Sequence, residues 1–482
     1  MSGIAKFKKE ANFVGGEWIA ADSGETIDVT NPATGEVIGT VPNCGEAETN
    51  RAIDAAAEAF KSFGTSSTAE RVKLARNLHD ALMDNQATLA ELLTLEMGKP
   101  LFEAMGEVGM GAAYVLWFAE EVRRAGGSVI PAPTNDRKLL ATRHPVGVVA
   151  AITPWNFPSS MLARKMGPAL AAGCPVVAKP ATATPFSALA WGVLAEEAGY
   201  PAGTVNVLTG SARAIGGAIM ASPKVRKVTF TGSTEVGKTL IRQSADTVKK
   251  VSMELGGNAP FIVFEDADID AAVEGAMVAK YRNMGQTCVC TNRFYVHSSV
   301  RDEFVEKLTA ATAAMKIGNG MDDGVAQGPM IDGKAVEFVE GMIADAVSKG
   351  ASIATGGKRH ELGGTFFEPT VITDATADMR FATEEIFGPL SAVFTFDDED
   401  AVIAAANDTV YGLASYAYTR DVGRVFRLND KLEYGLIGIN SGLITTPEAP
   451  FGGLKESGLG KEGGQQGLDD YLETKYIAIA GL

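Results

Sequence analysis

Short apolar runs alternate with helical segments from Val146 onward, and this alternation constrains the fold more than any other feature of the chain. Continuous apolar runs are typical of strands buried on both faces, as in parallel sheets with helical crossovers. The runs of the first set are VGVVAAIT (146–153), PVVAKP (175–180), VNVL (205–208) and KVTFTG (227–232), with helices expected at 159–172, 185–198, 211–221 and from Thr234 onward. The alternation therefore predicts an α/β fold.

A second alternating set begins near residue 260. Its expected strands are FIVFED (261–266), RFYVHSS (293–299), PLSAVFTF (389–396), ASYAYT (414–419) and GLIGIN (435–440), with helices at 268–284, 301–315, 398–407 and 421–430. A chain of 482 residues is too long for one ordinary core. We therefore expect two parallel α/β domains that meet near 252–260.

The rest of the chain adds helices and a β excursion. Helical periodicity marks 50–63, 68–97 and 102–124. The segment 126–146 contains the alternating stretch KLLATRHPV, which predicts a β excursion outside the cores. The strand-like C-terminus KYIAIAGL (475–482) can pair with this excursion or with another subunit.

Charge and cysteine usage exclude several classes of protein. The net charge of −16 argues against nucleic acid or anionic membranes as partners. No apolar run approaches the roughly 18 residues of a membrane span, and no apolar signal segment follows the N-terminal lysines. Four cysteines in so long a chain indicate a reducing, cytoplasmic compartment. The four histidines show no metal-ligand spacing, so we expect no metal site.

Cys288 is the foremost candidate for catalysis. It lies in the turn GQTCVC (285–290), where a preceding helix and a glycine would expose its sulfur. A thiolate attacks an aldehyde carbonyl even at neutral pH, and the thiohemiacetal that forms carries a hydride that a nicotinamide can accept. A small buried thiol without a catalytic role is the alternative.

Glu254 and Asn156 would complete a catalytic set. Glu254 in MELGGNAP ends a strand before two glycines, where a partly buried carboxylate with a raised pKa can activate water for thioester hydrolysis. Asn156 in PWNF follows a strand end, and its amide can donate to an oxyanion together with the Cys288 backbone N–H. The alternatives are a solvated turn carboxylate and an asparagine that caps the helix at 159–172.

Further residues suit a dinucleotide and an acidic substrate. Lys179 ends a strand, where an ammonium can bind ribose hydroxyls or phosphate. FTGSTEVGK (230–238) runs from a strand into a helix N-terminus, which favours pyrophosphate, although it is not the G-x-G-x-x-G fingerprint. Arg164 and Arg282 can clamp a carboxylate with paired hydrogen bonds, unless they are solvated surface residues.

Taken together, these residues resemble the aldehyde dehydrogenase superfamily over nearly the whole chain. The motifs that carry the resemblance are NPATGEVI (31–38), ITPWNFP (152–158), VVAKPA (176–181), FTGSTEVGK (230–238), MELGGNAP (253–260), GQTC (285–288), EEIFGP (384–389) and PFGGLKESGLGKEG (450–463). Within the superfamily the chain is most similar to succinate-semialdehyde dehydrogenases, on GQTCVC followed by TNR, SSMLARKMGPALAAGC (159–174), TPFSALA (184–190) and DYLETKYIAIAGL.

The resemblance implies NAD(P)-dependent oxidation of succinate semialdehyde to succinate. It makes Cys288 the nucleophile, Glu254 the base and Asn156 the oxyanion donor. The implied cofactor contacts are Thr153, Pro154, Trp155, Lys179, Thr182, Gly232, Ser233, Leu255, Glu385 and Phe387, and the implied substrate contacts are Arg164, Arg282 and either Thr445 or Thr446.

Two positions carry further expectations. Many NAD-preferring members have glutamate three residues after the matching lysine, whereas this chain has Thr182, which removes the repulsion toward a 2′-phosphate. We therefore expect NADP to be preferred and NAD to be accepted. Cys290 is a redox-switch candidate that would tie up the catalytic thiol in a disulfide, although a C-x-C bridge is strained. A buried structural thiol is the alternative.

The resemblance also implies two Rossmann-like parallel α/β domains plus a small β oligomerisation element. The expected division is an NAD(P)-binding domain (1–125 and 147–252), a catalytic domain (253–440), an oligomerisation element (126–146 and 465–482) and a substrate loop region (441–464). A homodimer or homotetramer is expected.

Three other readings remain open. One is a related substrate such as glutarate semialdehyde, which is one methylene longer. Another is a CoA-acylating dehydrogenase, which a retained Glu254 disfavours. The last is a structural protein without activity, which would be expected to lose Cys288 or Glu254.

Overall fold

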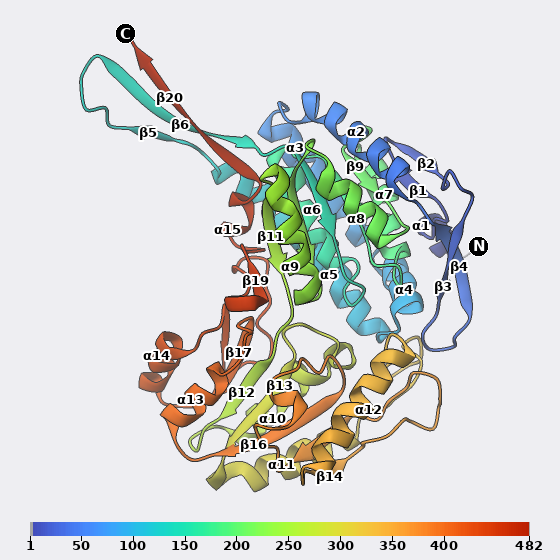
Figure 1. The fold of residues 1–482 in the computed structure, drawn as a ribbon, viewed down its shortest axis with the longest axis vertical. Helices are drawn as coiled ribbons and strands as arrows, with labels where there is room; N and C mark the ends of the chain where they lie inside the picture. Colours follow the sequence, from blue (N-terminus) through green and yellow to red (C-terminus); the bar gives the residue numbers. More distant parts are fainter. Residues whose placement is uncertain (1–2, 482) are drawn as a thin grey trace.

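Two α/β bodies and a β arm that projects from one of them make up the molecule (Figure 1). The computed structural model describes residues 3–481. The N-terminal body contains an 8-stranded sheet in the order β19-β11-β10-β7-β8-β9-β1-β2. Its strands are β1 (Asn12–Val14), β2 (Glu17–Ile19), β7 (Val148–Ile152), β8 (Val176–Lys179), β9 (Val205–Val207), β10 (Val225–Thr231), β11 (Lys250–Glu254) and β19 (Gly458–Leu459).

The five strands from β11 to β9 are mutually parallel, which confirms the predicted α/β class. The helices of this body are α1 (Ile4–Phe7), α2 (Glu46–Phe63), α3 (Thr68–Asp84), α4 (Gln86–Met97), α5 (Leu101–Glu121), α6 (Ser160–Ala172), α7 (Phe186–Ala198), α8 (Ala212–Ala221), α9 (Thr234–Ser244) and α15 (Gln466–Asp469). Helices α6 and α7 connect parallel strands and are almost wholly buried.

The second body contains a 7-stranded sheet in the order β14-β15-β16-β13-β12-β17-β18. Its strands are β12 (Ala259–Val263), β13 (Thr291–His297), β14 (Ser352–Thr355), β15 (Thr370–Thr373), β16 (Leu390–Phe396), β17 (Ala414–Tyr418) and β18 (Leu436–Ile439). Its helices are α10 (Ile269–Tyr281), α11 (Ser298–Ala313), α12 (Gly333–Ser348), α13 (Glu399–Asn407) and α14 (Val422–Lys431). All neighbouring strands are parallel except β14 and β15.

The arm is a 3-stranded sheet of β5 (Ser128–Ile130), β6 (Arg137–Pro145) and β20 (Leu472–Ala480). The C-terminal strand pairs with β6 over nine residue pairs, from Leu472 with Pro145 to Ala480 with Arg137. Of the two partners that the sequence left open, the chain therefore uses its own 126–146 excursion. The end of the predicted strand, at residue 482, lies outside the described residues.

Several predicted boundaries are wrong for identifiable reasons. The expected helix 68–97 is two helices, because Asn85 leaves helical geometry and its amide donates to the Ala81 carbonyl at 2.8 Å. The expected helix 268–284 ends at Tyr281, and a 3₁₀ turn with left-handed residues follows. The hairpins β1–β2 and β3 (Thr26–Thr30) with β4 (Val37–Pro42) were not predicted, nor were α12, β14 and β15.

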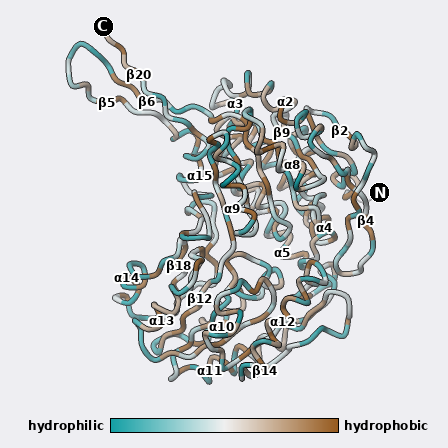
Figure 2. The backbone as a smooth tube through the Cα atoms, viewed as in Figure 1, coloured by the Kyte–Doolittle hydropathy of each residue, from teal (hydrophilic) through white to brown (hydrophobic). Residues whose placement is uncertain are grey.

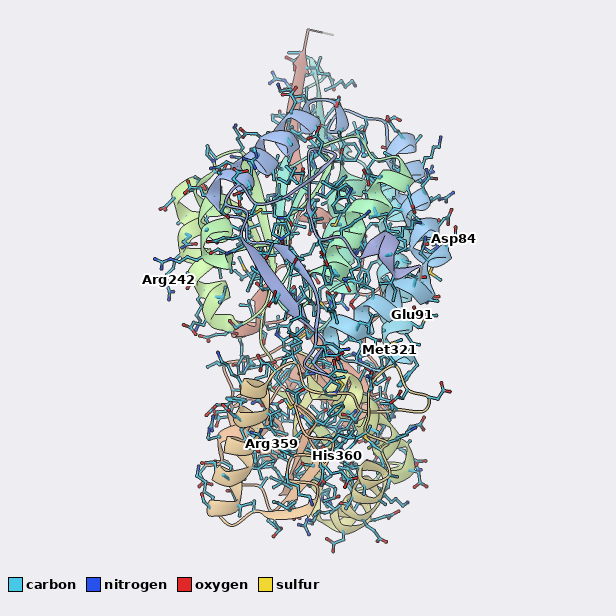
Figure 3. All side chains as sticks on the ribbon, turned by 90° about the vertical axis from the view of Figure 1, so that its right-hand side faces the viewer. Asp84, Glu91, Arg242, Met321, Arg359 and His360 are labelled. Carbon is cyan, nitrogen blue, oxygen red and sulfur yellow. The ribbon has the colours of Figure 1, made fainter. Side chains whose placement is uncertain are left out.

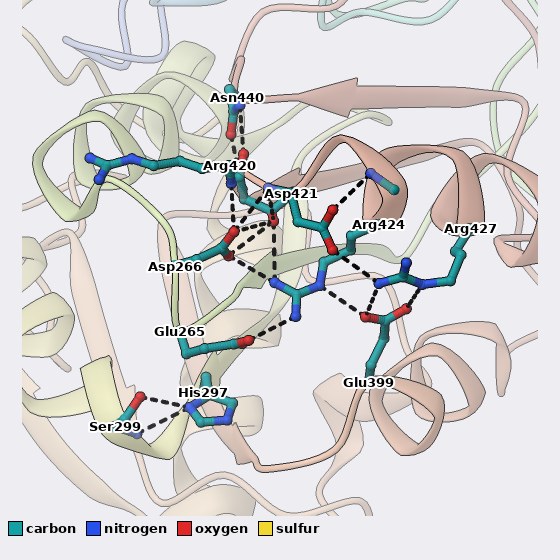
Figure 4. A network of polar contacts seen from close by, with 12 residues as sticks. Glu265, Asp266, His297, Ser299, Glu399, Arg420, Asp421, Arg424, Arg427 and Asn440 are labelled. Atoms are coloured by element: carbon teal, nitrogen blue, oxygen red, sulfur yellow. Dashed lines mark hydrogen bonds and ion pairs between the residues drawn. The ribbon is translucent and has the colours of Figure 1, made fainter.

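A network of ion pairs explains why β12 stops at Val263 instead of continuing to residue 266 (Figure 4). Arg424 on α14 pairs with Glu265 and Asp266 at 2.8 Å each and with Glu399 at 2.9 Å. Asp266 also accepts the backbone N–H groups of Arg420 and Asp421. The carboxylates that follow β12 thus bind the start of α14 instead of extending the sheet.

Buried glutamates cap the N-termini of two helices that approach the junction of the bodies. Glu96, at the end of α4, accepts the N–H groups of Phe186 and Ser187 at 2.7 Å each, at the start of α7. Glu107 on α5 accepts those of Ser159 and Ser160 at the start of α6. Because helix N-termini carry unpaired donors, the oxygens of these two side chains stabilise both helix starts.

The two bodies meet at a narrow waist, which is plain in the perpendicular view, where Met321 lies at the level of the junction (Figure 3). There Leu101 N–H donates to the Gly320 carbonyl at 2.9 Å. Hydrophilic segments lie along outer elements such as α14, whereas hydrophobic segments run between the helices (Figure 2). Among residues 3–481, every helix is too short or too polar to span a bilayer.

Candidate active site

Two cavities meet at Cys288 where the bodies join. The first, of about 250 Å³, is lined by Pro154, Trp155, Asn156, Met161, Thr231, Gly232, Ser233, Leu255, Gly256, Cys288, Glu385 and Phe387. The second, of about 300 Å³, is lined by Phe102, Glu103, Gly106, Glu107, Met110, Phe157, Ser160, Met161, Arg164, Arg282, Thr287, Cys288, Val289, Leu443, Thr445 and Phe451. Cys288 and Met161 line both cavities, so the sulfur atom of Cys288 faces the first cavity and the second.

The turn before Cys288 has an unusual backbone. Asn283, Met284 and Gly285 have φ values of 54°, 55° and 72°. A side chain at Gly285 would collide with the Gly388 carbonyl, and one at Gly257 with the Cys288 carbonyl. These glycines let the turn lie directly against MELGG and EEIFGP, so the three motifs meet at the site.

The Cys288 thiol is partly buried. Burial raises its pKa to about 12, and the nearby Glu385 carboxylate raises it as well, while Arg164 opposes the shift. In the free protein the sulfur is therefore a thiol near neutral pH. A positive charge brought close to it would favour the thiolate.

Asn156 faces the first cavity just after β7. Its side-chain amide donates to the Gln286 carbonyl at 2.9 Å, which leaves one N–H of the NH₂ group for a further acceptor. Its backbone carbonyl accepts from Lys99 Nζ at 2.8 Å and from Asn283 Nδ2 at 2.9 Å. The alternative role as a helix cap is not observed, because Ser159 occupies that position at α6.

Glu254 ends β11 in register with Thr231 and is 2% exposed. Among the described residues, neither of its carboxylate oxygens has a hydrogen-bond partner. Burial raises its pKa well above the ordinary value, and the neighbouring Glu462 carboxylate adds to the effect. Glu254 itself lines neither of the two cavities formed by the described residues. The next two residues, Leu255 and Gly256, line the first cavity.

Seven of the ten predicted cofactor contacts line the first cavity, namely Pro154, Trp155, Gly232, Ser233, Leu255, Glu385 and Phe387. Glu385 accepts the Gly257 N–H at 3.0 Å, and burial raises its pKa to about 8. Ser233 caps α9 through its hydroxyl, so the N-terminus of that helix begins at the cavity wall. Phe387 packs edge-on against Trp155 at 5.6 Å.

The other three predicted cofactor contacts, Thr153, Lys179 and Thr182, do not line the first cavity as the described residues form it. Thr153 is buried, and Thr182 is exposed on the loop after β8. Lys179 ends β8 and donates to the Pro180 carbonyl at 2.9 Å, and burial lowers its pKa to about 8. An ammonium at a strand end with no carboxylate partner among residues 3–481 is suited to bind an anionic or hydroxyl-rich group.

Arg164 and Arg282 both line the second cavity, which Cys288 also lines. The Arg164 guanidinium lies between the rings of Tyr114 and Phe451, 4.9 and 4.4 Å from their centroids, and 3.8 Å from Glu462. Arg282 lies 5.7 Å from the Phe157 ring centroid, and its Nε has no partner among the described residues.

The structure distinguishes the two threonines of the C-terminal loop. Thr445 lines the second cavity, whereas Thr446 is exposed and donates to Glu448. Cys290 is buried, and its thiol donates to the Lys280 carbonyl at 2.9 Å. All four cysteines, which lie within residues 3–481, are free thiols. The switch assigned to Cys290 stays a prediction.

Sequence reasoning missed the residues that hold the site together. Lys99, Glu107 and Asn283 fix the backbone around Asn156, while Lys165 and Glu462 form a buried ion pair near Glu254. Glu462 lies within the motif PFGGLKESGLGKEG, and Asn283 lies two residues before the start of GQTC, so proximity to a motif was the available signal. The clusters of His, Cys, Asp and Glu within residues 3–481 include no group of three that could hold a metal ion.

Comparisons with known proteins find similarity over nearly the whole chain. The model of the aldehyde dehydrogenase family matches residues 18–477. A Pseudomonas aeruginosa protein named glutarate-semialdehyde dehydrogenase is 56% identical over 99% of both chains. An Escherichia coli K12 protein named succinate-semialdehyde dehydrogenase [NADP(+)] is 55% identical over 98% of both chains. A crystal structure of succinate-semialdehyde dehydrogenase from Burkholderia pseudomallei has a TM-score of 0.99 and 54% identity, and covers 100% of both chains.

Proposed function

Because the chain belongs to the aldehyde dehydrogenase family, we propose that it oxidises succinate semialdehyde to succinate with NADP or NAD as hydride acceptor. The observation that carries this proposal is the second cavity, where two arginines share a wall with Cys288. A short aldehyde with a distal carboxylate suits such a wall, since the aldehyde carbon can reach the sulfur while the carboxylate approaches a guanidinium.

The residues of the chain act in a fixed order in the proposed reaction. The Cys288 thiol releases its proton to solvent and the thiolate adds to the aldehyde carbon. The free N–H of Asn156 and the Cys288 backbone N–H then stabilise the oxyanion that forms. The nicotinamide cofactor supplies the hydride acceptor. The carbonyl then re-forms as a thioester on Cys288, whose hydrolysis returns the thiol and releases the acid.

Glu254 is the proposed base for that hydrolysis. It takes a proton from the attacking water as the new C–O bond forms. Its raised pKa suits this role, because a base with a pKa nearer to the working pH accepts the proton more readily. The neighbouring Glu462 carboxylate and Lys165 ammonium set the charge around it.

The two bound groups are proposed to occupy separate cavities. The first cavity, with the N-terminus of α9 and Glu385 on its wall, suits a dinucleotide. Lys179 and Thr182 lie near the same sheet edge, and the absence of a carboxylate at Thr182 supports NADP as the preferred cofactor. Kinetic efficiencies with both cofactors test the preference, and Thr182→Glu should shift it toward NAD.

The substrate assignment is tested on the arginines. Arg164→Ala and Arg282→Ala should raise KM for succinate semialdehyde by about 10–100-fold, the effect of losing a charge-assisted hydrogen bond, and change KM for neutral butyraldehyde little. Arg76→Ala, which removes an exposed arginine paired with Glu120, is the control. Equal changes for both aldehydes would show that the arginines do not bind the carboxylate.

Glutarate semialdehyde is a second candidate substrate, favoured by the identity to the Pseudomonas aeruginosa relative of that name. One methylene changes discrimination by only about 1–3 kcal/mol, so the same cavity can accept both aldehydes. A CoA-acylating reaction would replace water by CoA, and product analysis with and without CoA separates it from hydrolysis.

We also propose a homodimer or homotetramer in the cytoplasm. Support for the assembly comes from the arm, where Val129 is 76% and Tyr476 63% exposed. Apolar side chains on a projecting sheet are typical of a subunit interface. Four free thiols suit a reducing compartment.

A further inference from the structure

Asn283 connects the loop of the oxyanion donor to the turn of the nucleophile. Its side-chain amide donates to the carbonyl of Asn156 at 2.9 Å and to the carbonyl of Gln286 at 3.2 Å. The Gln286 carbonyl also accepts the Asn156 side-chain amide, at 2.9 Å. One buried side chain thus ties together a loop from the N-terminal body and the turn two residues before Cys288.

The conformation of Asn283 is held from several sides. Its φ of 54° and ψ of 38° are left-handed, a region that is unfavourable for most residues other than glycine and asparagine. Its backbone N–H donates to Glu103 at 2.8 Å, and its carbonyl accepts the Gln286 backbone N–H at 2.9 Å. Lys99 supplies the second donor to the Asn156 carbonyl, so that loop is fixed by two independent hydrogen bonds.

We propose that Asn283 is a positioning residue that fixes the Asn156 amide relative to the Cys288 sulfur. This proposal rests on the proposed function, in which that amide stabilises the oxyanion. An oxyanion donor acts only when its N–H lies within hydrogen-bond reach of the developing charge, so a small displacement lowers the rate. Asn283 itself lines neither cavity among the described residues, and therefore acts through Asn156, which lines the first cavity.

The variant Asn283→Gly distinguishes the effect of the side-chain amide from the effect of the backbone conformation. Glycine adopts the left-handed conformation freely, so this variant removes the donor without straining the turn. We expect the pre-steady-state burst of reduced cofactor with succinate semialdehyde to slow by on the order of 10–100-fold, with KM nearly unchanged. A wild-type burst rate in Asn283→Gly would overturn the proposal, since it would show that only the backbone conformation matters.

A double-mutant cycle tests whether the effect passes through Asn156. In the Asn156→Ala background, Asn283→Gly should cause little additional loss, because the group that it positions is already absent. Losses that multiply would mean that Asn283 acts independently of Asn156 and would contradict the proposal. If Asn283→Gly does not fold, Asn283→Asp, which also tolerates the left-handed region and lacks the donor, takes its place in the cycle.

Alkylation of Cys288 by iodoacetamide provides the readout that a general structural defect would move. This reaction forms no oxyanion, so its rate should be the same in wild type and Asn283→Gly. A parallel fall in alkylation would show that Asn283 shapes the nucleophile instead. Asn206→Ala is the matched control, because Asn206 is a buried amide that bridges the carbonyls of Val176 and Gly203 away from the site, and its burst rate should be unchanged. Failure of the proposed function would appear differently, as no formation of reduced cofactor from succinate semialdehyde by the wild type.

Discussion

At the scale of single residues, the thiol of Cys288 gives a direct prediction. Because its pKa in the free protein is raised to about 12, the thiolate fraction should increase about tenfold for each pH unit below that value. We expect the rate of iodoacetamide alkylation, measured without cofactor, to climb steadily from pH 7 to pH 10. A plateau between pH 8 and pH 9 would mean that the sulfur is less desolvated than its surroundings indicate.

Glu254 gives the second residue-scale prediction. Glu254→Gln keeps the volume and removes the proposed base, so the thioester should form and then persist. One equivalent of reduced cofactor should appear at close to the wild-type rate, followed by a steady state that is slower by about 10²–10⁴-fold. Mass spectrometry should detect the acyl adduct on Cys288. A variant whose burst and steady state slow equally would assign Glu254 to the first half of the reaction.

How far the sequence predicts the site differs between residues. Cys288, Arg164, Arg282 and Thr445 share one cavity. Cys288 and the arginines are candidates from their residue types and motifs, whereas Thr445 follows only from the resemblance to the family, which left Thr446 as an alternative. Lys99 was not predicted, since its partner at Asn156 lies 57 residues away and a lone lysine carries no sign of burial. Long-range hydrogen bonds of this kind leave no periodic trace in a single sequence.

At the scale of elements, the junction of α4 and α7 is sensitive to pH. Burial raises the pKa of Glu96 to about 8. Between about pH 4.5 and pH 8 the unfolded chain loses this proton while the folded chain keeps it, so this group makes folding less favourable as pH rises through that window. Glu96→Gln removes the titration, and its unfolding free energy should depend less on pH than that of the wild type.

Glu96→Gln should also lower the free energy of unfolding at pH 5. Glutamine can accept one of the two N–H groups at the start of α7 but turns its own NH₂ toward the other, which leaves a buried donor unpaired. We expect a loss of about 1–3 kcal/mol in urea unfolding at pH 5. Glu91→Gln, on the same helix, is the control, and a loss of equal size there would contradict the capping argument.

Elements were predicted best where strands are long and apolar. The strands β7, β10, β13 and β16 lie within two residues of their predicted bounds. The three-residue strands β1 and β2 were missed because two or three residues show no alternation. The break at Asn85 was also missed, since helical periodicity continues across it and only the capping geometry of the asparagine interrupts the backbone.

At the scale of the whole molecule, the exposed arm predicts how subunits associate. Val129→Asp together with Tyr476→Asp should leave the isolated chain folded, because both side chains are largely exposed in it. If the arm forms the subunit interface, charge there should lower the mass measured by light scattering to that of a smaller assembly. Val422→Asp, 70% exposed on α14, is the control. An unchanged mass for the arm variant would place the interface elsewhere.

The sulfur shared by the two cavities has a consequence for inhibition. Since the compartments approach Cys288 from different walls, with Met161 as the other common residue, a dinucleotide and an aldehyde need not displace each other. A bisubstrate ligand would therefore extend past the sulfur into both cavities and combine the binding free energies of its two halves. The anionic end of such a compound would also make it bind this protein more tightly than relatives whose second cavity lacks two arginines.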